Sequence, residues 1–272
     1  TPAEVRLPAD VGFPTEVVAV GEDVVVLEEV TDIDHSSGSG ESLYSTSDLV
    51  LRRVATDGST TWTVRLGTFV DWYRSYQQSS LAFDGETVRV AWPRYDGDLP
   101  APLYTAEPAT LVMSAVSIDG QLESEVDLQP IPVPDPAETG VSFTAAMGAG
   151  GTVASGRVDG GTLVVDTFDP SGRPLWRDEI EASPSPIPLV AVLADDEVAA
   201  AWGGHLIRWT ADGDPKWDLP MEPSSLASIT PESGSSEADL VVGMTGDGSW
   251  YCAVDPNGRL VLRTSEARGF WG

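Results

Sequence analysis

Residues 167–176 read TFDPSGRPLW, and the fold of the chain is predicted from this stretch. An apolar segment ends in a Pro-Ser-Gly turn, and Trp176 follows Gly172 by four residues. Two other stretches repeat the pattern, 54–62 (VATDGSTTW) and 209–217 (WTADGDPKW). Tight turns between antiparallel strands select Asp-Gly and Pro-x-Gly sequences, because glycine accepts a positive φ without steric cost. We therefore interpret the stretch as a β-hairpin that recurs along the chain.

Two kinds of turn alternate along the whole sequence, five of each. The hairpin turns with glycine lie at 57–58, 119–120, 170–172, 212–213 and 256–258. Between them lie acidic or glycine turns that lead into alternating strands, at 21–23, 84–86, 150–151, 195–197 and 237–239. The segments between the turns are short and rich in β-branched residues, which is typical of strands. The periodicity predicts an all-β chain of five units, each with four antiparallel strands.

Units of four short antiparallel strands repeated around an axis make a β-propeller. We expect residues 1–272 to form a single β-propeller domain of about five blades, because all-β domains often reach this length. The alternatives are a propeller with six or more irregular blades, and two β-sandwiches. Segment 4–7 (EVRL) resembles segment 63–66 (TVRL), which is expected to be an outermost strand. The N-terminus could therefore close a five-bladed ring or begin an irregular sixth blade.

The three stretches quoted above resemble the D-x-x-G-x-x-x-W repeats of quinoprotein-like (PQQ-repeat-like) β-propellers. The resemblance covers most of the chain, and it implies that Trp62, Trp176 and Trp217 dock neighbouring blades onto one another. Quinone-dependent dehydrogenases of that superfamily are larger, usually eight-bladed, and often carry a vicinal disulfide. This chain has one cysteine, Cys252, so we expect no quinone cofactor. The members that it resembles are non-enzymatic extracytoplasmic scaffolds, which implies a protein that is secreted or attached to the cell surface.

The composition argues against several classes of partner. The chain has 43 acidic and 15 basic residues, a formal charge of −28, which repels the phosphate backbone of a nucleic acid. Its longest apolar runs have the length of strands, far short of the ~20 residues of a membrane-spanning helix. A single cysteine forms neither an intrachain disulfide nor a cysteine cage for a metal. We expect a protein or a glycan as the partner, and neither a nucleic acid nor a transmembrane segment.

Three long segments of the first two units are the candidates for a binding site. They lie near 29–47, 67–78 and 93–109, and the strand order places them on the propeller face opposite the short hairpins. Aromatic rings mixed with arginine and aspartate suit a groove for a sugar or a peptide. The candidate ligand-binding residues are Asp71, Trp72, Tyr73, Arg74, Tyr76, Arg94, Tyr95 and Tyr104. The alternative is that these rings pack the long segments onto the rim of the propeller.

Signals for a metal or for catalysis are few. Asp32 and Asp34 resemble the start of an EF-hand loop and could offer oxygen ligands to calcium. The loop then departs from that pattern, with Ser37 in place of glycine, so a solvated acidic loop is the alternative. We predict no catalytic residues and no other cofactor, because His35 and His205 have no recognisable catalytic setting. The enzymatic alternative is a glycan-active hydrolase with paired carboxylates near the propeller axis.

Overall fold

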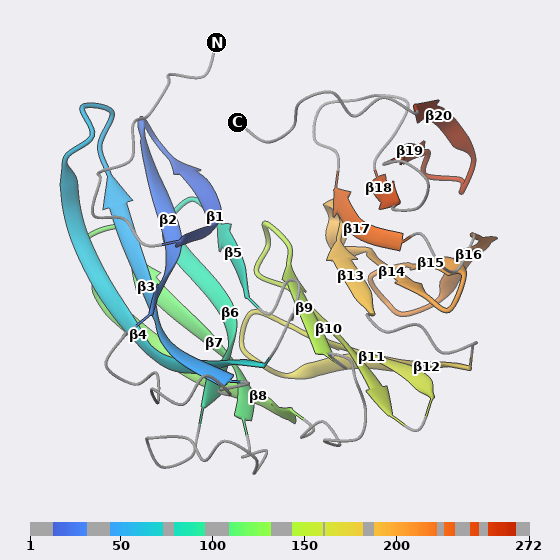
Figure 1. The fold of residues 1–272 in the computed structure, drawn as a ribbon, viewed down its shortest axis with the longest axis horizontal. Coiled ribbons are helices and arrows are strands. Elements are labelled where there is room, and N and C mark those ends of the chain that lie inside the picture. Colours follow the sequence, from blue (N-terminus) through green and yellow to red (C-terminus); the bar gives the residue numbers. More distant parts are fainter. Residues whose placement is uncertain are drawn as a thin grey trace. The chain divides into compact units, whose positions relative to one another are not determined.

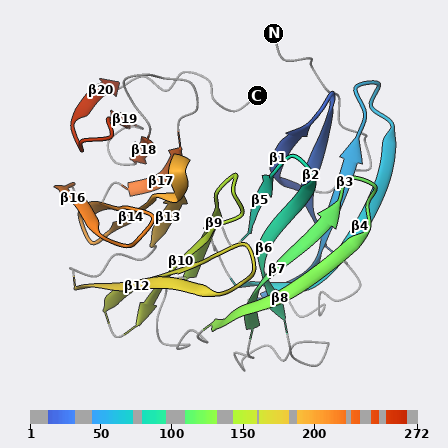
Figure 2. The same cartoon turned by 180° about the vertical axis from the view of Figure 1, so that it is seen from behind.

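The computed structural model describes residues 13–31, 44–72, 79–95, 109–131, 143–159, 161–181, 188–221, 226–231, 240–244 and 250–264. Their regular structure consists of β-strands and one short 3-10 turn, Ala194–Asp196. The strands form five four-stranded antiparallel sheets, each made of four consecutive strands (Figure 1; Figure 2). The predicted fold class is confirmed: the chain is all-β and has the five four-stranded sheets of a five-bladed β-propeller.

The chain divides into two compact units. Unit 1 comprises Thr1–Val141, Ala149–Gly151 and Pro170–Arg173, and unit 2 comprises Ser142–Gly148, Thr152–Asp169 and Pro174–Gly272. Sheets 1 and 2 belong to unit 1, and the strands of sheets 3, 4 and 5 belong to unit 2. Two turns of sheet 3, Ala149–Gly151 and Pro170–Arg173, are assigned to unit 1. A single domain over residues 1–272 stays a prediction.

The two sheets of unit 1 are the longest. Sheet 1 consists of β1 (Phe13–Val20), β2 (Asp23–Thr31), β3 (Tyr44–Val54) and β4 (Thr60–Trp72). Sheet 2 consists of β5 (Ser80–Phe83), β6 (Thr87–Tyr95), β7 (Ala109–Ser117) and β8 (Leu122–Ile131). In both sheets each strand pairs with the next one in the sequence.

The sheets of unit 2 follow the same order. Sheet 3 has β9 (Phe143–Met147), β10 (Val153–Asp159), β11 (Thr162–Phe168) and β12 (Pro174–Glu181). Sheet 4 has β13 (Leu189–Val192), β14 (Val198–Trp202), β15 (His205–Trp209) and β16 (Pro215–Pro220). Sheet 5 has β17 (Leu226–Pro231), β18 (Leu240–Met244), β19 (Trp250–Val254) and β20 (Leu260–Thr264).

Burial falls from the second and third strands of a sheet to its fourth. Every residue of β14 is buried, and β15 is buried except for half-exposed His205. β16 instead alternates between exposed and half-buried positions, because only one of its faces meets protein. The apolar runs in the sequence therefore mark central strands, and the alternating charged runs mark fourth strands.

Neighbouring sheets of one unit pack face to face. In unit 1, sheets 1 and 2 share a core built around Leu27, Leu51, Val90 and Trp92. In unit 2, Trp202 and Trp209 lie in the core between sheets 3 and 4. Sheets 4 and 5 share a second core, in which Cys252 is 2% exposed. Cys252 thus behaves as a small buried hydrophobic residue, as its apolar setting in the sequence suggests.

One structural detail recurs in all five sheets. The register between the third and fourth strands shifts at the same distance from each hairpin, four residues before its glycine. The shifts end at Val54, Val116, Phe168, Trp209 and Val254. Four of the hairpins also share two backbone hydrogen bonds, exemplified by Gly213 N to Thr210 O and Thr210 N to Asp214 O. The five sheets are therefore structural repeats, including sheets 2 and 5, which lack the tryptophan four residues after the hairpin glycine.

Candidate functional site

The third and fourth strands of sheet 1, β3 and β4, are longer than the third and fourth strands of the other sheets, and β4 carries Asp71 and Trp72 near its far end. The ladder between β3 and β4 runs as far as Tyr44, which pairs with Trp72, and Ser45, which pairs with Asp71. Asp71 and Trp72 therefore lie on a paired strand and not in a loop. Tyr73, Arg74, Tyr76 and Tyr104 lie outside the described residues, as do Asp32 and Asp34 of the calcium candidate.

A bulge sets the course of this extension. Leu49 pairs with Gly67 and Val50 pairs with Arg65, so Leu66 is the extra residue of β4. A Cβ on Gly67 would lie 2.8 Å from Cη2 of Trp92 in sheet 2. Only glycine lets the strand pass this close to the buried indole.

A small polar cluster spans the bulge and links β3 to β4. The Arg65 guanidinium donates to Asp48 Oδ1 at 2.7 Å, and Thr68 Oγ lies 3.1 Å from the same oxygen. The hydrogen bond to Asp48 and then its negative charge raise the pKa of Arg65 above its ordinary value. The cluster fixes the base of the extension that carries Asp71 and Trp72.

Arg94 and Tyr95, at the end of β6, are the two candidates whose side chains are described. Arg94 Nη1 lies 2.6 Å from Glu125 Oε1 and 3.0 Å from Asp127 Oδ1, both on β8. Tyr95 is only 9% exposed. The structure therefore brings Arg94 to an ion-pair network, while the Tyr95 side chain is buried.

The Arg94 network reaches into the core of unit 1. Trp92 Nε1 donates to Ser114 Oγ at 2.9 Å, and Ser114 Oγ lies 3.2 Å from Glu125 Oε2. Glu125 thus joins a buried indole to a guanidinium that is 29% exposed. Sequence analysis missed Ser114, Glu125 and Asp127. Finding them requires the pairing register, because Ser114 lies on β7 beside the strand of Arg94, whereas Glu125 and Asp127 lie on β8, one strand further.

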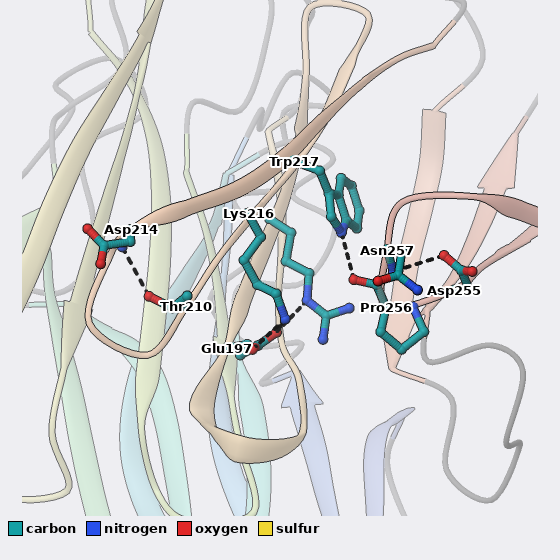
Figure 3. A network of polar contacts seen from close by, with 9 residues as sticks. Glu197, Thr210, Asp214, Lys216, Trp217, Asp255, Pro256 and Asn257 are labelled. Carbon is teal, nitrogen blue, oxygen red and sulfur yellow. Dashed lines mark hydrogen bonds and ion pairs between the residues drawn. The ribbon is translucent and has the colours of Figure 1, made fainter.

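The three repeat tryptophans make one and the same contact with the next sheet of their unit. Each indole N–H donates to the carbonyl two residues before the next hairpin glycine, with Nε1–O distances of 2.8 Å (Trp62 to Ile118), 3.0 Å (Trp176 to Ala211) and 3.1 Å (Trp217 to Pro256; Figure 3). A Cβ on those glycines would lie 2.6 to 3.0 Å from the nearest ring atom of the tryptophan. The glycine is required both by its positive φ and by the ring that covers it.

Sheet 2 has Ser124 at the position of the tryptophan, four residues after Gly120. The side chain that lies nearest to Gly172, a residue of unit 1, is Val126. Val126 has no side-chain N–H, so it cannot donate the hydrogen bond that Trp62 donates to the Ile118 carbonyl.

A second polar network lies on sheet 4 (Figure 3). Glu197 Oε2 is 2.5 Å from Arg208 Nε, and Glu197 Oε1 is 2.8 Å from the Nζ of Lys216, the only lysine of the chain. Burial raises the pKa of Glu197, but the hydrogen bonds and charges of Lys216 and Arg208 outweigh it, so that the pKa lies below its ordinary value. The pairing stabilises the hairpin end of sheet 4.

Nine of the described basic side chains form ion pairs with carboxylates of the same chain. The ion pairs are Arg52–Glu28, Arg53–Asp23, Arg65–Asp48, Arg89–Asp84, Arg94–Glu125, Arg157–Asp166, Arg177–Glu179, Arg208–Glu197 and Lys216–Glu197. Much of the positive charge among the described residues is thus already paired within the chain, while the chain as a whole carries an excess of negative charge. This distribution disfavours an anionic partner.

Catalytic groups remain sparse in the part of the chain that the structure describes. His205 Nδ1 lies 2.9 Å from Asp218 Oδ1 on the exposed side of sheet 4. No group of three or more His, Cys, Asp or Glu side chains that could hold a metal occurs among the described residues. Across the first strands of the five sheets, Glu16 is the one acidic residue within the printed bounds.

The comparisons with known proteins add little to this description. No family model and no curated protein matches the chain. A protein of unknown function from Bacteroides caccae matches at 11% identity and a TM-score of 0.46, over 94% of this chain and 92% of that one. A prolyl endopeptidase structure matches at 10% identity and 0.49, over 95% of this chain but 43% of the other. A chain of the mitotic checkpoint complex matches at 10% identity and 0.47, over 97% and 87%. Similarity at this level carries no argument about function.

No helix among the described residues has the length and apolar character needed to cross a membrane.

Proposed function

We propose that this protein is a non-enzymatic binding or scaffold β-propeller of the quinoprotein-like type, located outside the cytoplasm, either secreted or attached to the cell surface. It recognises a protein or a glycan through the long-loop ends of sheets 1 and 2. The observation that supports this proposal is the extension of sheet 1. Its third and fourth strands have 11 and 13 residues, against 5 and 6 in sheet 4 and 5 and 5 in sheet 5.

A strand extension suits recognition for a physical reason. Residues that a paired ladder already holds in place lose less conformational entropy on binding than residues of a free loop. Asp71 and Trp72 occupy such positions, and the bulge at Leu66 and Gly67 directs the strand that carries them. An aromatic residue on a paired strand suits a sugar ring or an apolar peptide side chain.

The charge at the other described candidate, Arg94, restricts the chemistry of the proposed partner. Arg94 already has two carboxylate partners, Glu125 and Asp127, so this group of three carries a net negative charge. We therefore expect a partner that is neutral or positively charged at the contact, such as an uncharged glycan or a basic peptide segment.

The experiment is a screen of the purified chain against a glycan array and a peptide array, repeated with Trp72→Ala. The proposal expects the hits of the parent chain to be lost in this variant. Leu175→Ala is the matched control, because Leu175 is 48% exposed and lies on β12, the fourth strand of sheet 3, and not on sheet 1 or sheet 2. It should keep the hits. Binding that survives in Trp72→Ala contradicts the proposal.

A further inference from the structure

Glu16 is an unusual residue for its place in the fold. The first strands of sheets 2 to 5 read SLAF, FTAAM, LVAV and LASITP, without a charged residue, whereas β1 carries Glu16 in FPTEVVAV. A register shift between Pro14 and Glu16 precedes it, so Thr15 is the extra residue of β1. Thr15 Oγ donates to the Leu27 carbonyl at 3.2 Å, which holds this bulge in place.

The carboxylate of Glu16 contacts the backbone of the neighbouring sheet. Glu16 Oε2 accepts a hydrogen bond from the backbone N–H of Leu81 on β5. β5 is the edge strand of sheet 2 and pairs only with β6, where Leu81 lies opposite Val90. The Leu81 N–H therefore depends on a partner from outside its own sheet, and Glu16 supplies it.

The charged groups on the elements around Glu16 are engaged elsewhere. β1 and β5 carry no other charged residue. On β2, Asp23 pairs with Arg53 and Glu28 with Arg52. Glu29, on β2 opposite Phe13, is half-buried and of the same charge sign as Glu16.

The cations of β6 do not compensate Glu16 either. Arg89 pairs with Asp84, and Arg94 pairs with Glu125 and Asp127. Burial raises the pKa of Glu16 to about 7, although the hydrogen bond from Leu81 opposes the shift. An acid in this setting is most easily accommodated as the neutral carboxylic acid, whose carbonyl oxygen still accepts the Leu81 N–H.

We propose that Glu16 is a proton-dependent clamp, which holds the first strands of sheets 1 and 2 together most tightly in weakly acidic solution and loosens as the pH rises toward neutrality. Glu16 is half-buried in the folded protein. When the proton leaves, further hydration stabilises the carboxylate. Separation of β1 from β5 supplies this hydration and breaks the bond to Leu81. The ligand-binding candidates lie on the same two sheets, but the clamp does not depend on the proposed binding function.

The sign of the effect follows from the two protonation states. An opened clamp exposes Glu16, whose pKa then returns to its ordinary value near 4.5, whereas the closed clamp binds the proton more tightly. The opening equilibrium therefore rises by about tenfold per pH unit between these two pKa values and levels off above the higher one.

The experiment combines two measurements by NMR on the whole chain. The carboxyl carbon shift of Glu16 is followed from pH 4 to 9, and the exchange protection factor of the Leu81 amide is measured over the same range. We expect a midpoint near 7 and a Leu81 protection that falls as the pH rises from about 5 to 7 and is constant above. Glu16→Gln keeps the acceptor but cannot ionise, so its Leu81 protection should not vary with pH.

The control is Glu22→Gln, at an exposed glutamate in the turn between β1 and β2, which should behave as the parent chain. A Glu16 midpoint near 4.5 overturns the proposal, and so does a Leu81 protection that is constant in the parent chain or falls equally in Glu16→Gln. If Glu16→Gln does not fold, the midpoint and the protection profile of the parent chain decide.

Discussion

The indole of Trp176 covers the α-carbon of Gly213. A Cβ built on Gly213 would lie 2.7 Å from Cγ of Trp176, and the indole N–H donates to Ala211 two residues earlier. The same pair of contacts joins Trp62 to Gly120 and Trp217 to Gly258. A hairpin glycine of one sheet thus serves as the receiving surface for the tryptophan of the sheet before it.

The Gly213→Ala variant should lose clearly more stability than a glycine substitution in open space. We expect a loss of about 3 kcal/mol or more in the free energy of unfolding, because the alanine meets both a positive φ and the indole ring. Gly161→Ala is the matched control: the φ values are 87° and 88°, and nothing lies within 4 Å of a Cβ at Gly161. It should lose only about 1 kcal/mol. Urea unfolding of both variants measures the difference, and equal losses would show that the indole contact has no effect.

Two buried tryptophans allow the value of an indole hydrogen bond to be separated from packing. Trp209 and Trp202 lie in the same core at 0% and 2% exposure, but only Trp209 Nε1 has a partner, Asp178 Oδ2 at 2.8 Å. Trp209→Phe should therefore cost about 1.5–3 kcal/mol more than Trp202→Phe, because a carboxylate also loses its donor. Chemical denaturation of the two variants provides the comparison. If Trp202→Phe is the more damaging change, the hydrogen bond to Asp178 does not contribute as argued.

The stability contributed by Glu197 should depend on pH. Its pKa is lowered in the folded protein, so its contribution is present above the unfolded value near 4.5 and is lost as the pH falls through the folded value. At pH 7, Glu197→Gln should lose about 1–3 kcal/mol, because Arg208 is 5% exposed and loses this partner. Glu179→Gln, at an exposed pair with Arg177, should lose at most about 0.5 kcal/mol. Thermal unfolding from pH 3 to 8 tests this, and the deficit of Glu197→Gln must shrink in acid.

The close approach of Gly67 to Trp92 predicts a coupling between the two positions. Gly67→Ala should destabilise the protein by about 1–3 kcal/mol, because the new methyl group has no room beside the buried indole. In the background of Trp92→Phe, which lacks the outer ring atoms, the same change should cost at least about 1 kcal/mol less. A double-mutant cycle of unfolding free energies measures this coupling. A coupling of zero would place the origin of the bulge elsewhere in β4.

Much of the fold could be predicted because turns and apolar runs are local signals. The Asp-Gly pairs at 57–58 and 212–213 mark the turns between antiparallel strands. The apolar run Val198–Trp202, directly after Glu197, marks a strand in the middle of its sheet. The candidate site could be predicted only as a region. The sequence places Asp71 and Trp72 in a long segment between strands, whereas the structure has them paired on β4. The length of β4 depends on pairing with Tyr44 and Ser45, nearly thirty residues earlier, and a local pattern does not reveal that pairing.

The sequence by itself determined the number of repeats, the place of each hairpin and the identity of Trp62, Trp176 and Trp217 as a set, since these depend on neighbours within a few residues. Only the tertiary structure decided that Arg94 is held by Glu125, that Tyr95 is buried, and that Glu16 reaches the edge of β5. Those relationships join residues tens of positions apart, and their energies depend on burial and on the partner's geometry. Neither is set until the sheets have packed.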